Sequence, residues 1–272
     1  MAGKQVVLIT GGNTGIGYET VKALYQSSTA YDILIGSRSI EKGNAAVSSL
    51  EKESPNSSST LSVVQVDLTS DESIERAVAV IKDQHGKLDV CINNAGGSFD
   101  RELQAGRLSI REAFNASWDL NVTGTQVLTT LVMPLLLKSS NARLLFITSG
   151  TSTLAGTERF DHPTYARLNA SPAAGWPKDE STIQVVSYKS AKTGLNMLMR
   201  EWHKLTKNDG VKVWAISPGF LATGLGGVGA ETLKKMGAQD PEVGGIFIRD
   251  VVQGMRDDDQ GKVVGPSVVQ PW

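Results

Sequence analysis

The 272-residue chain contains one cysteine, Cys91, and three histidines. A single cysteine excludes an internal disulfide bond and any cluster of thiolate metal ligands. His85, His162 and His203 stand far apart in the sequence, and their spacing does not resemble that of metal ligands. We therefore expect no metal site.

Excess charge and long apolar runs are also missing. The formal net charge is −1, so no charge pattern favours binding to nucleic acid or to an anionic membrane. The first apolar run stops at Gly11 and is too short for a signal peptide. The longest run, residues 127–137, is shorter than the roughly 18 apolar residues of a membrane span. We expect a cytoplasmic protein without nucleic-acid or membrane partners.

What the sequence does contain is a regular alternation of short β-branched runs and segments of helical length. The runs cover residues 5–10, 32–37, 61–67, 88–93, 143–149 and 211–218. Between them, apolar residues recur at helical spacing, as at Ile74, Ala77 and Ile81. Continuous apolar strands separated by helices are typical of a parallel sheet that is covered on both faces. The sequence predicts an α/β fold with a doubly wound parallel sheet of the Rossmann type, whose ligand crevice lies at the carboxyl ends of the strands.

No linker rich in proline and serine divides the chain, so we expect residues 1–272 to form a single domain. One stretch, residues 150–186, interrupts the alternation of strands and helices and is too long for an ordinary connection. Loops of this length are usually functional or disordered, and the aromatic residues of this one favour order. We interpret it as an insertion that forms a substrate loop before the helix that carries Tyr188.

The first predicted strand ends in the glycine-rich stretch TGGNTGIG at residues 10–17. Gly11 permits a tight turn, Gly15 lets a pyrophosphate approach the backbone, and Gly17 allows close packing of the following helix. The free N–H groups at the start of that helix would face the phosphates. A glycine-rich turn alone can be purely structural, but its place after the first strand favours a dinucleotide site.

The end of the second predicted strand indicates which dinucleotide binds. An NAD site usually has an acidic residue here that accepts hydrogen bonds from the ribose 2′-hydroxyl. This chain has Ser37 and Arg38 instead, and no carboxylate before Glu41. A guanidinium pairs with a 2′-phosphate, which a carboxylate would repel. The sequence therefore predicts NADP(H) as the cofactor.

Further motifs follow in a fixed order along nearly the whole chain. They are DL (67–68), NNAG (93–96), NVTG (121–124), ITS (147–149), YKSAK (188–192) and SPGFLAT (217–223). With the glycine turn, this set resembles the short-chain dehydrogenase/reductase family. The insertion and the ending GKVVGPSVVQPW give a weaker resemblance to the carbonyl-reductase branch of that family.

The family resemblance implies a catalytic set of Asn121, Ser149, Tyr188 and Lys192. Tyr188 would supply the proton for a carbonyl oxygen that turns negative on hydride transfer. We expect the ammonium of Lys192, four residues further along the helix, to lower the pKa of the tyrosine and to bind the nicotinamide ribose. Ser149 would polarise the carbonyl, and Asn121 would hold a water that links Lys192 to solvent.

The predicted cofactor contacts combine the glycine turn, the second strand end and the family motifs. They are Gly11, Asn13, Thr14, Gly15, Ile16, Gly17, Ser37, Arg38, Asp67, Leu68, Asn94, Ala95, Gly96, Tyr188, Lys192, Pro218, Gly219, Leu221 and Thr223. The resemblance implies that Asp67 contacts the adenine. One position departs from the family, because many members that use NADPH have a basic residue where this chain has Thr14. Recognition of the 2′-phosphate would then depend mainly on Arg38.

These residues predict an NADPH-dependent oxidoreductase that reduces a small-molecule ketone or aldehyde to an alcohol. Two alternatives stay open. One is a reductase dedicated to a C=O or C=N bond of one secondary metabolite. The other is a non-catalytic NADP(H)-binding sensor, against which the presence of Tyr188 and Lys192 counts.

The resemblance to the carbonyl-reductase branch also implies a monomer. In this interpretation the insertion covers the outer side of the helix after Asn121 and of the helix that carries Tyr188, where relatives pair. Phe160, Tyr165 and Trp176 would pack there. The competing interpretation is a mobile lid over the nicotinamide pocket, with these aromatic side chains facing the substrate.

Overall fold

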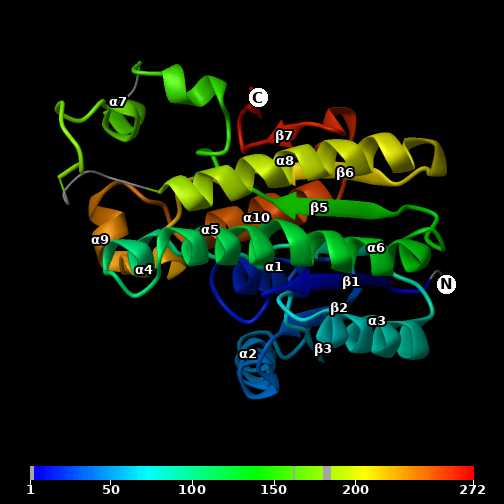
Figure 1. The fold of residues 1–272 in the computed structure, drawn as a ribbon. Helices are drawn as coiled ribbons and strands as arrows, with labels where there is room; N and C mark the ends of the chain where they lie inside the picture. Colours follow the sequence, from blue (N-terminus) through cyan, green and yellow to red (C-terminus); the bar gives the residue numbers. More distant parts are fainter. Residues whose placement is uncertain (1–2, 162, 180–184) are drawn as a thin grey trace.

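The computed structural model describes residues 3–161, 163–179 and 185–272. It contains one sheet with the strand order β3-β2-β1-β4-β5-β6-β7-β8 (Figure 1). Neighbouring strands are parallel, except that β8 runs antiparallel to β7. The strands are β1 (Gln5–Thr10), β2 (Tyr31–Ser37), β3 (Thr60–Gln65), β4 (Val90–Asn93), β5 (Arg143–Ile147), β6 (Lys212–Ile216), β7 (Val263–Val264) and β8 (Val269–Gln270). The predicted doubly wound parallel sheet is confirmed.

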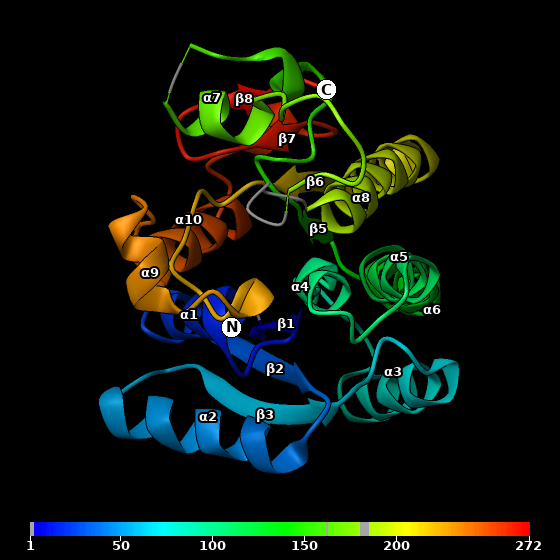
Figure 2. The same cartoon turned by 60° about the vertical axis from the view of Figure 1, so that its left-hand side comes forward.

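Helices cover both faces of the sheet (Figure 2). They are α1 (Gly15–Tyr25), α2 (Ile40–Glu53), α3 (Asp71–His85), α4 (Asp100–Gln104), α5 (Ile110–Trp118), the π-helical turn η1 (Asp119–Thr123), α6 (Gly124–Leu136), the 3₁₀ turn η2 (Ala155–Glu158), α7 (Pro163–Asn169), α8 (Val186–Thr206), the 3₁₀ turn η3 (Lys207–Asp209), the 3₁₀ turn η4 (Leu225–Gly227), α9 (Ala230–Lys235), α10 (Pro241–Val252) and the 3₁₀ turn η5 (Asp257–Asp259). The residues described between 3 and 272 include no helix with both the length and the hydropathy needed to cross a membrane.

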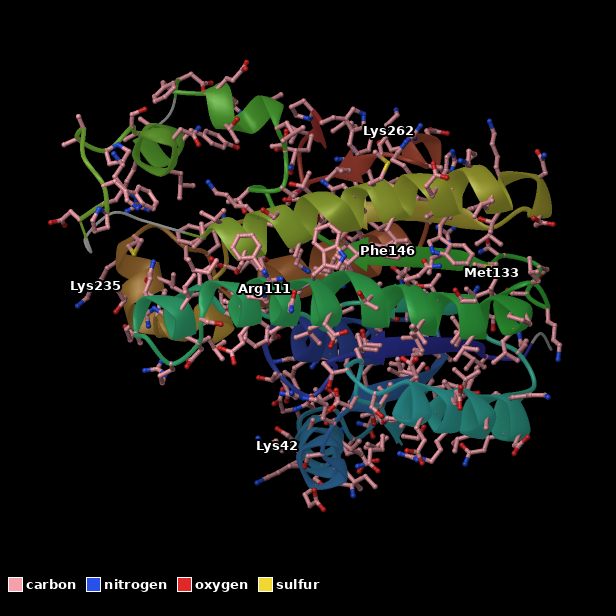
Figure 3. The ribbon with its side chains drawn as sticks, viewed as in Figure 1. Lys42, Arg111, Met133, Phe146, Lys235 and Lys262 are labelled. Atoms are coloured by element: carbon pink, nitrogen blue, oxygen red, sulfur yellow. The ribbon has the colours of Figure 1, made fainter. Side chains whose placement is uncertain are left out.

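The core consists of two apolar layers, one on each side of the sheet. Within β1, Val6 and Leu8 point into the layer formed with α3, α6 and α8, whereas Val7 and Ile9 point into the layer formed with α1, α2 and α10. This alternation follows from the two-residue period of a strand. Phe146, labelled in Figure 3, is fully buried in the first layer. Because both faces of the inner strands are buried, β1, β4, β5 and β6 are largely apolar, as the sequence indicates. The edge strand β3 is partly exposed and contains polar residues.

Several strands are shorter than their apolar runs, and two short strands do not follow from the sequence pattern. β3 ends at Gln65, β5 at Ile147 and β6 at Ile216, each two residues before the end of its run. The chain leaves the sheet at these points, so the residues that follow lie in loops at the carboxyl edge. β7 and β8 have two residues each, which is too short for a strand period to show.

The insertion before α8 folds against the end of the chain that carries β8. Ala155 at the start of η2 donates its N–H to the carbonyl oxygen of Trp272 at 2.8 Å. The amide of Asn169, the last residue of α7, donates to the carbonyl oxygens of Gly156 and Arg159, at 2.8 Å each. These bonds link α7 to η2 and η2 to the C-terminal residue. Residues 162 and 180–184 of the predicted insertion lie outside the described residues.

The predicted packing of the insertion aromatics is wrong for two of the three. Phe160 is 59% exposed and Trp176 is 87% exposed. Figures 1 and 2 both show α7 on the side of β7 and β8, away from α5 and α6. The bond between Ala155 and Trp272 directs η2 toward that edge of the sheet, so the described part of the insertion does not cover the outer face of α6.

Candidate active site

The glycine turn joins the carboxyl end of β1 to the start of α1. Gly11 and Gly15 have positive φ angles of 65° and 56°, a conformation that other residues adopt only at a cost. A Cβ atom at Gly17 would lie 2.3 Å from the carbonyl oxygen of Gly11. The side chain of Thr14, the N-cap of α1, makes no capping hydrogen bond, so it leaves the first N–H groups of the helix to other acceptors.

The end of β4 holds this turn in place. Asn94 donates its side-chain N–H to the carbonyl oxygen of Thr10 at 2.8 Å. The hydroxyl of Thr10 accepts the backbone N–H groups of Asn94 at 3.0 Å and Ala95 at 2.9 Å. Asn93 instead donates its amide to the Thr129 hydroxyl on α6 at 3.1 Å. Asn94 and Thr10 thus fix the position of the predicted phosphate turn relative to the next strand of the sheet.

The ends of β2 and β3 present one cation and one carboxylate. Ser37 is buried and donates its hydroxyl to the carbonyl oxygen of Ser39 at 2.8 Å. Arg38 is exposed, and within the described residues no side chain pairs with its guanidinium. Asp67 accepts the backbone N–H of Thr69 at 3.0 Å through one carboxylate oxygen. Leu68 is buried beside it.

The loop after β6 returns to the glycine turn. A Cβ atom at Gly15 would lie 3.8 Å from the Cβ of Thr223. Gly219 has a φ angle of 110°, and Leu221 is buried. A Cβ atom at Gly244 of α10 would lie 2.5 Å from the Leu221 side chain and 3.3 Å from that of Pro218. The structure therefore brings this loop, the glycine turn and the end of β4 together at one edge of the sheet.

Asn121 lies in the π-helical turn η1 between α5 and α6. Such turns occur often at functional sites, because the extra residue in the turn redirects a side chain. Asn121 is fully buried and donates its amide hydrogens to the carbonyl oxygens of Gly97 at 2.9 Å and Ser117 at 2.7 Å. Its side-chain oxygen accepts the N–H of Gly97 at 3.3 Å. Only that oxygen retains hydrogen-bonding capacity, so the water predicted for Asn121 stays a prediction.

The first turns of α8 carry the predicted tyrosine and lysine toward the end of β5. Lys192 is 4% exposed and donates its ammonium to the carbonyl oxygen of Ile147 at 2.9 Å. Its Nζ lies 5.8 Å from the centre of the Tyr188 ring. A Cβ atom at Gly96 would lie 3.1 Å from the same Nζ. The ammonium of Lys192 therefore lies between the end of β5, the segment after β4 and the ring of Tyr188.

Burial dominates the electrostatics of this group. It raises the pKa of Tyr188 to about 12, and a hydrogen bond with Ser149 acts in the opposite direction. Burial also lowers the pKa of Lys192 to about 8. The expectation that Lys192 lowers the pKa of Tyr188 is not met in this structure, because the loss of solvent disfavours both charged forms. At neutral pH the tyrosine is therefore protonated.

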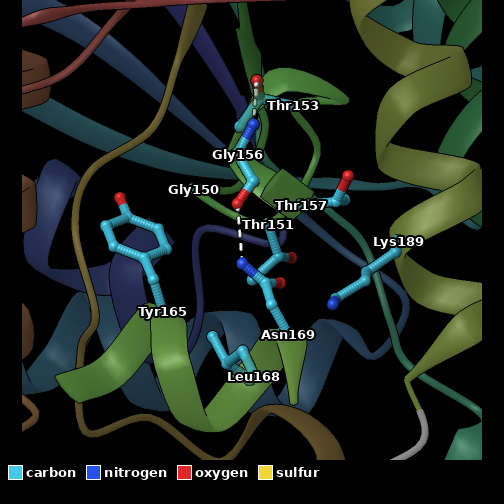
Figure 4. A pocket seen from close by; sticks show the side chains of 9 residues that line it. All are labelled: Gly150, Thr151, Thr153, Gly156, Thr157, Tyr165, Leu168, Asn169 and Lys189. Atoms are coloured by element: carbon cyan, nitrogen blue, oxygen red, sulfur yellow. Dashed lines mark hydrogen bonds between the residues drawn. The ribbon is translucent and has the colours of Figure 1, made fainter. Parts of the chain in front are cut away.

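Ser149 lies at the entry to the insertion. Its hydroxyl is 2.9 Å from the hydroxyl of Thr151 and accepts the N–H of Thr151 at 3.1 Å. The amide of Gln270, in β8, donates to the carbonyl oxygen of Ser149 at 3.2 Å. Figure 4 shows a small cavity next to this segment. Its lining residues are Gly150, Thr151, Thr153, Gly156, Thr157, Tyr165, Leu168, Asn169 and Lys189.

Three supporting residues were not found from the sequence. Thr10 arranges the end of β4, Gln270 holds the backbone of Ser149, and Asp100 accepts the first N–H groups of α8. Each acts on a segment far away in the sequence, and although Thr10 and Gln270 lie in stretches quoted above, no motif indicates these contacts. Within the described residues, no three His, Cys, Asp or Glu side chains gather as metal ligands.

The fold and these residues define a doubly wound protein with the glycine turn typical of dinucleotide-binding proteins. The family model for short chain dehydrogenases matches residues 5–162. The short-chain dehydrogenase/reductase eupG from Phoma sp is 44% identical over 278 residues, which cover 99% of this chain and 98% of that protein. The chain belongs to the short-chain dehydrogenase/reductase family and is an oxidoreductase of that family.

Solved structures agree on the fold. The NADPH-bound carbonyl reductase from chicken fatty liver matches with a TM-score of 0.77 at 21% identity, and the match covers 100% of both chains. A 3-oxoacyl-[acyl-carrier protein] reductase from Brucella melitensis in complex with NAD matches with a TM-score of 0.74 at 19% identity. That match covers 97% of this chain and 96% of the other. At these identities the likeness concerns the fold alone.

Proposed function

We propose that the protein reduces a ketone or aldehyde to an alcohol with NADPH and that Tyr188 donates the proton. The observation that carries the proposal is the Tyr188 side chain, whose ring centre lies 5.8 Å from the Nζ atom of the buried Lys192 and whose pKa is lowered by Ser149 against the effect of burial. Its raised pKa keeps the phenol protonated at neutral pH, as a proton donor requires.

The residues at the ends of β1 and β2 fit NADPH. Gly17 leaves no room for a side chain against Gly11, so α1 packs closely on the turn, and Gly15 presents no side chain where the backbone would approach a pyrophosphate. Arg38 offers an exposed guanidinium, which pairs well with a 2′-phosphate. We propose that Arg38 selects NADPH over NADH and that Asp67 contacts the adenine. Solved structures of the same fold hold either cofactor, so the fold by itself does not decide between them.

In the proposed reaction, bound NADPH supplies the hydride that reaches the carbonyl carbon. Ser149 donates a hydrogen bond to the carbonyl oxygen and stabilises the negative charge that develops there. Tyr188 then transfers its hydroxyl proton to that oxygen, which yields the alcohol. Burial lowers the pKa of Lys192, and in its protonated form Lys192 stabilises the tyrosinate until a proton from solvent replaces the one transferred.

A second candidate is a reductase dedicated to one biosynthetic carbonyl or imine. The observation that favours it is the likeness to eupG, which extends over 99% of this chain. We propose that residues 150–186 form the substrate loop in either case. Phe160 and Trp176 are exposed in that segment, and their rings would be available to an apolar substrate.

A screen of aldehydes, ketones and imines against NADPH and NADH tests the proposal, with loss of cofactor absorbance as the readout. We expect turnover of at least one carbonyl compound with NADPH. Tyr188→Phe should bind NADPH normally and lose activity by several orders of magnitude, because only the proton donor is removed. If Tyr188→Phe retains substantial activity, the assignment of the tyrosine is wrong.

A monomer in the cytoplasm stays a prediction from the sequence. The sequence argument for a monomer required the aromatic residues of the insertion to pack on the outer helices, but Phe160 and Trp176 face solvent. Instead, Ile110, Phe114 and Trp118 form an exposed apolar stripe along α5. Light scattering decides the assembly state. A mass of 29.0 kDa supports the monomer, and a multiple of it would show self-association.

A further inference from the structure

Helix α8 begins without a capping side chain of its own. Val185 occupies its N-cap position and provides no side-chain hydrogen bond, and the first turn contains no acidic residue. By contrast, α2 and α3 are capped locally by the hydroxyls of Ser39 and Ser70. The first N–H groups of a helix need acceptors when they are buried. At α8 these acceptors come from a residue far away in the sequence.

That residue is Asp100, the first residue of α4. One carboxylate oxygen accepts the N–H of Ser187 at 2.9 Å, and the other accepts the N–H of Tyr188 at 3.1 Å. Asp100 is only 4% exposed. The positive end of the α8 dipole stabilises its negative charge. The carboxylate thus binds the backbone of the predicted proton donor directly.

The carboxylate also belongs to a network of hydrogen bonds that connects segments around the site. Ser98 donates its hydroxyl to Asp100 at 3.2 Å, and the hydroxyls of Ser187 and Ser117 lie 2.9 Å apart. The carbonyl oxygen of Ser117 accepts a hydrogen from Asn121, which also bonds to Gly97, the neighbour of Ser98. The network therefore connects the loop after β4, the π-helical turn η1 and the start of α8.

We propose that Asp100 is a positioning residue for Tyr188. Its carboxylate fixes the position and orientation of the first turn of α8. It thereby fixes the position of the Tyr188 hydroxyl relative to Ser149. In this role Asp100 acts through the backbone of Tyr188 and not on a reacting atom. The inference rests on the proposed role of Tyr188 as proton donor. Rates of such transfers depend steeply on position, because a displacement of about 1 Å can cost about a hundredfold in rate.

A matched control exists at the opposite edge of the sheet. Asp89 is also 4% exposed and also accepts a backbone N–H, that of Val6 at 2.9 Å. It stands just before β4, whereas Asp100 follows the carboxyl end of that strand. Asp89→Asn should therefore lower stability without moving Tyr188. Asp100→Ala removes both acceptors, and Asp100→Asn keeps one oxygen.

The first measurement requires no substrate. Amide hydrogen exchange at Ser187 and Tyr188 should become about tenfold faster in Asp100→Ala, the scale of a lost helix cap, and should stay unchanged in Asp89→Asn. The exchange rates in Asp100→Asn should lie between those of the other two variants. Asp100→Asn replaces Asp100→Ala if the latter does not fold. Unchanged exchange at both amides would overturn the inference.

The second measurement is turnover of a carbonyl compound found in the screen. We expect Asp100→Ala to lower kcat by about 10- to 100-fold, with the KM for NADPH unchanged and a larger solvent isotope effect on kcat. The isotope effect rises because proton transfer from a misplaced Tyr188 becomes slower, whereas a loss of folded protein leaves it unchanged. A wild-type kcat in Asp100→Ala, or an equal loss in Asp89→Asn, would refute positioning. Activity retained by Tyr188→Phe would instead refute the proposed function, but it would not refute the capping of α8 by Asp100.

Discussion

The buried lysine of the site makes a quantitative prediction about stability. Lys192 is 4% exposed, and burial lowers its pKa from 10.5 to about 8. Between these values the unfolded chain holds the lysine proton and the folded protein does not. The contribution of Lys192 to the free energy of unfolding is therefore lowest below pH 8. It rises with pH until the pH reaches 10.5. The shift corresponds to about 3 kcal/mol.

Lys192→Met isolates this contribution, because methionine fills a similar volume and carries no proton. Burial also raises the pKa values of Cys91 and Tyr188 to about 12 each, and these groups lower stability as the pH rises above their unfolded values. Both remain in the variant, so their effects cancel when the two proteins are compared.

The assay is urea unfolding of the cofactor-free protein across the alkaline range. We expect the stability of the wild type relative to Lys192→Met to increase by about 2–3 kcal/mol between about pH 7 and pH 10. A stability difference that does not change with pH would refute the assigned burial of the ammonium. If the stability of the wild type relative to Lys192→Met instead falls as the pH rises, the pKa of Lys192 is raised on folding and not lowered.

Two further predictions concern the cofactor site. Gly17→Ala places a methyl group 2.3 Å from the Gly11 carbonyl oxygen and 2.5 Å from the Asn94 amide, so NADPH binding in a fluorescence titration should weaken by at least about tenfold. Gly86→Ala is the control, because Gly86 has a positive φ angle but has open space around it and lies outside the site. Equal affinity of the two variants for NADPH would contradict the role of the tight turn. Arg38→Asp should reverse the preference from NADPH to NADH by replacing attraction to the 2′-phosphate with repulsion. Equal use of both cofactors by the wild type would contradict the role of Arg38.

The sequence was sufficient for the six longer strands of the sheet and for the local geometry of the glycine turn, because both depend on local patterns. Alternating runs of apolar strands and helices determine a doubly wound sheet. The glycine turn has a fixed relation to the strand before it, as confirmed by the 2.3 Å that would separate a Cβ at Gly17 from the Gly11 oxygen. Tyr188 and Lys192 share one helix face because they are four residues apart.

Contacts between distant segments could not be derived in this way. Asp100 binds the N–H of Tyr188 across 88 positions, and Asp257 pairs with Arg143 across 114 positions. Neither pair has a local signature. The direction of the pKa shift of Tyr188 was also out of reach, because it depends on how much solvent the fold removes around Tyr188 and Lys192. The position of the insertion on the sheet depends on the hydrogen bond between Ala155 and Trp272, which the spacing of residues in the sequence does not reveal.

The central claim is that this chain passes a hydride from NADPH to a carbonyl carbon and that Tyr188 supplies the proton. Transfer of isotope from NADPH deuterated at the nicotinamide C4 position tests the claim most directly, with product analysis by mass spectrometry and NMR. We predict one deuterium on the carbinol carbon of the alcohol made by the wild type, a hydroxyl proton from solvent, and no labelled product from Tyr188→Phe under the same conditions. A product without deuterium on that carbon, or a labelled product formed at the wild-type rate by Tyr188→Phe, would contradict the claim.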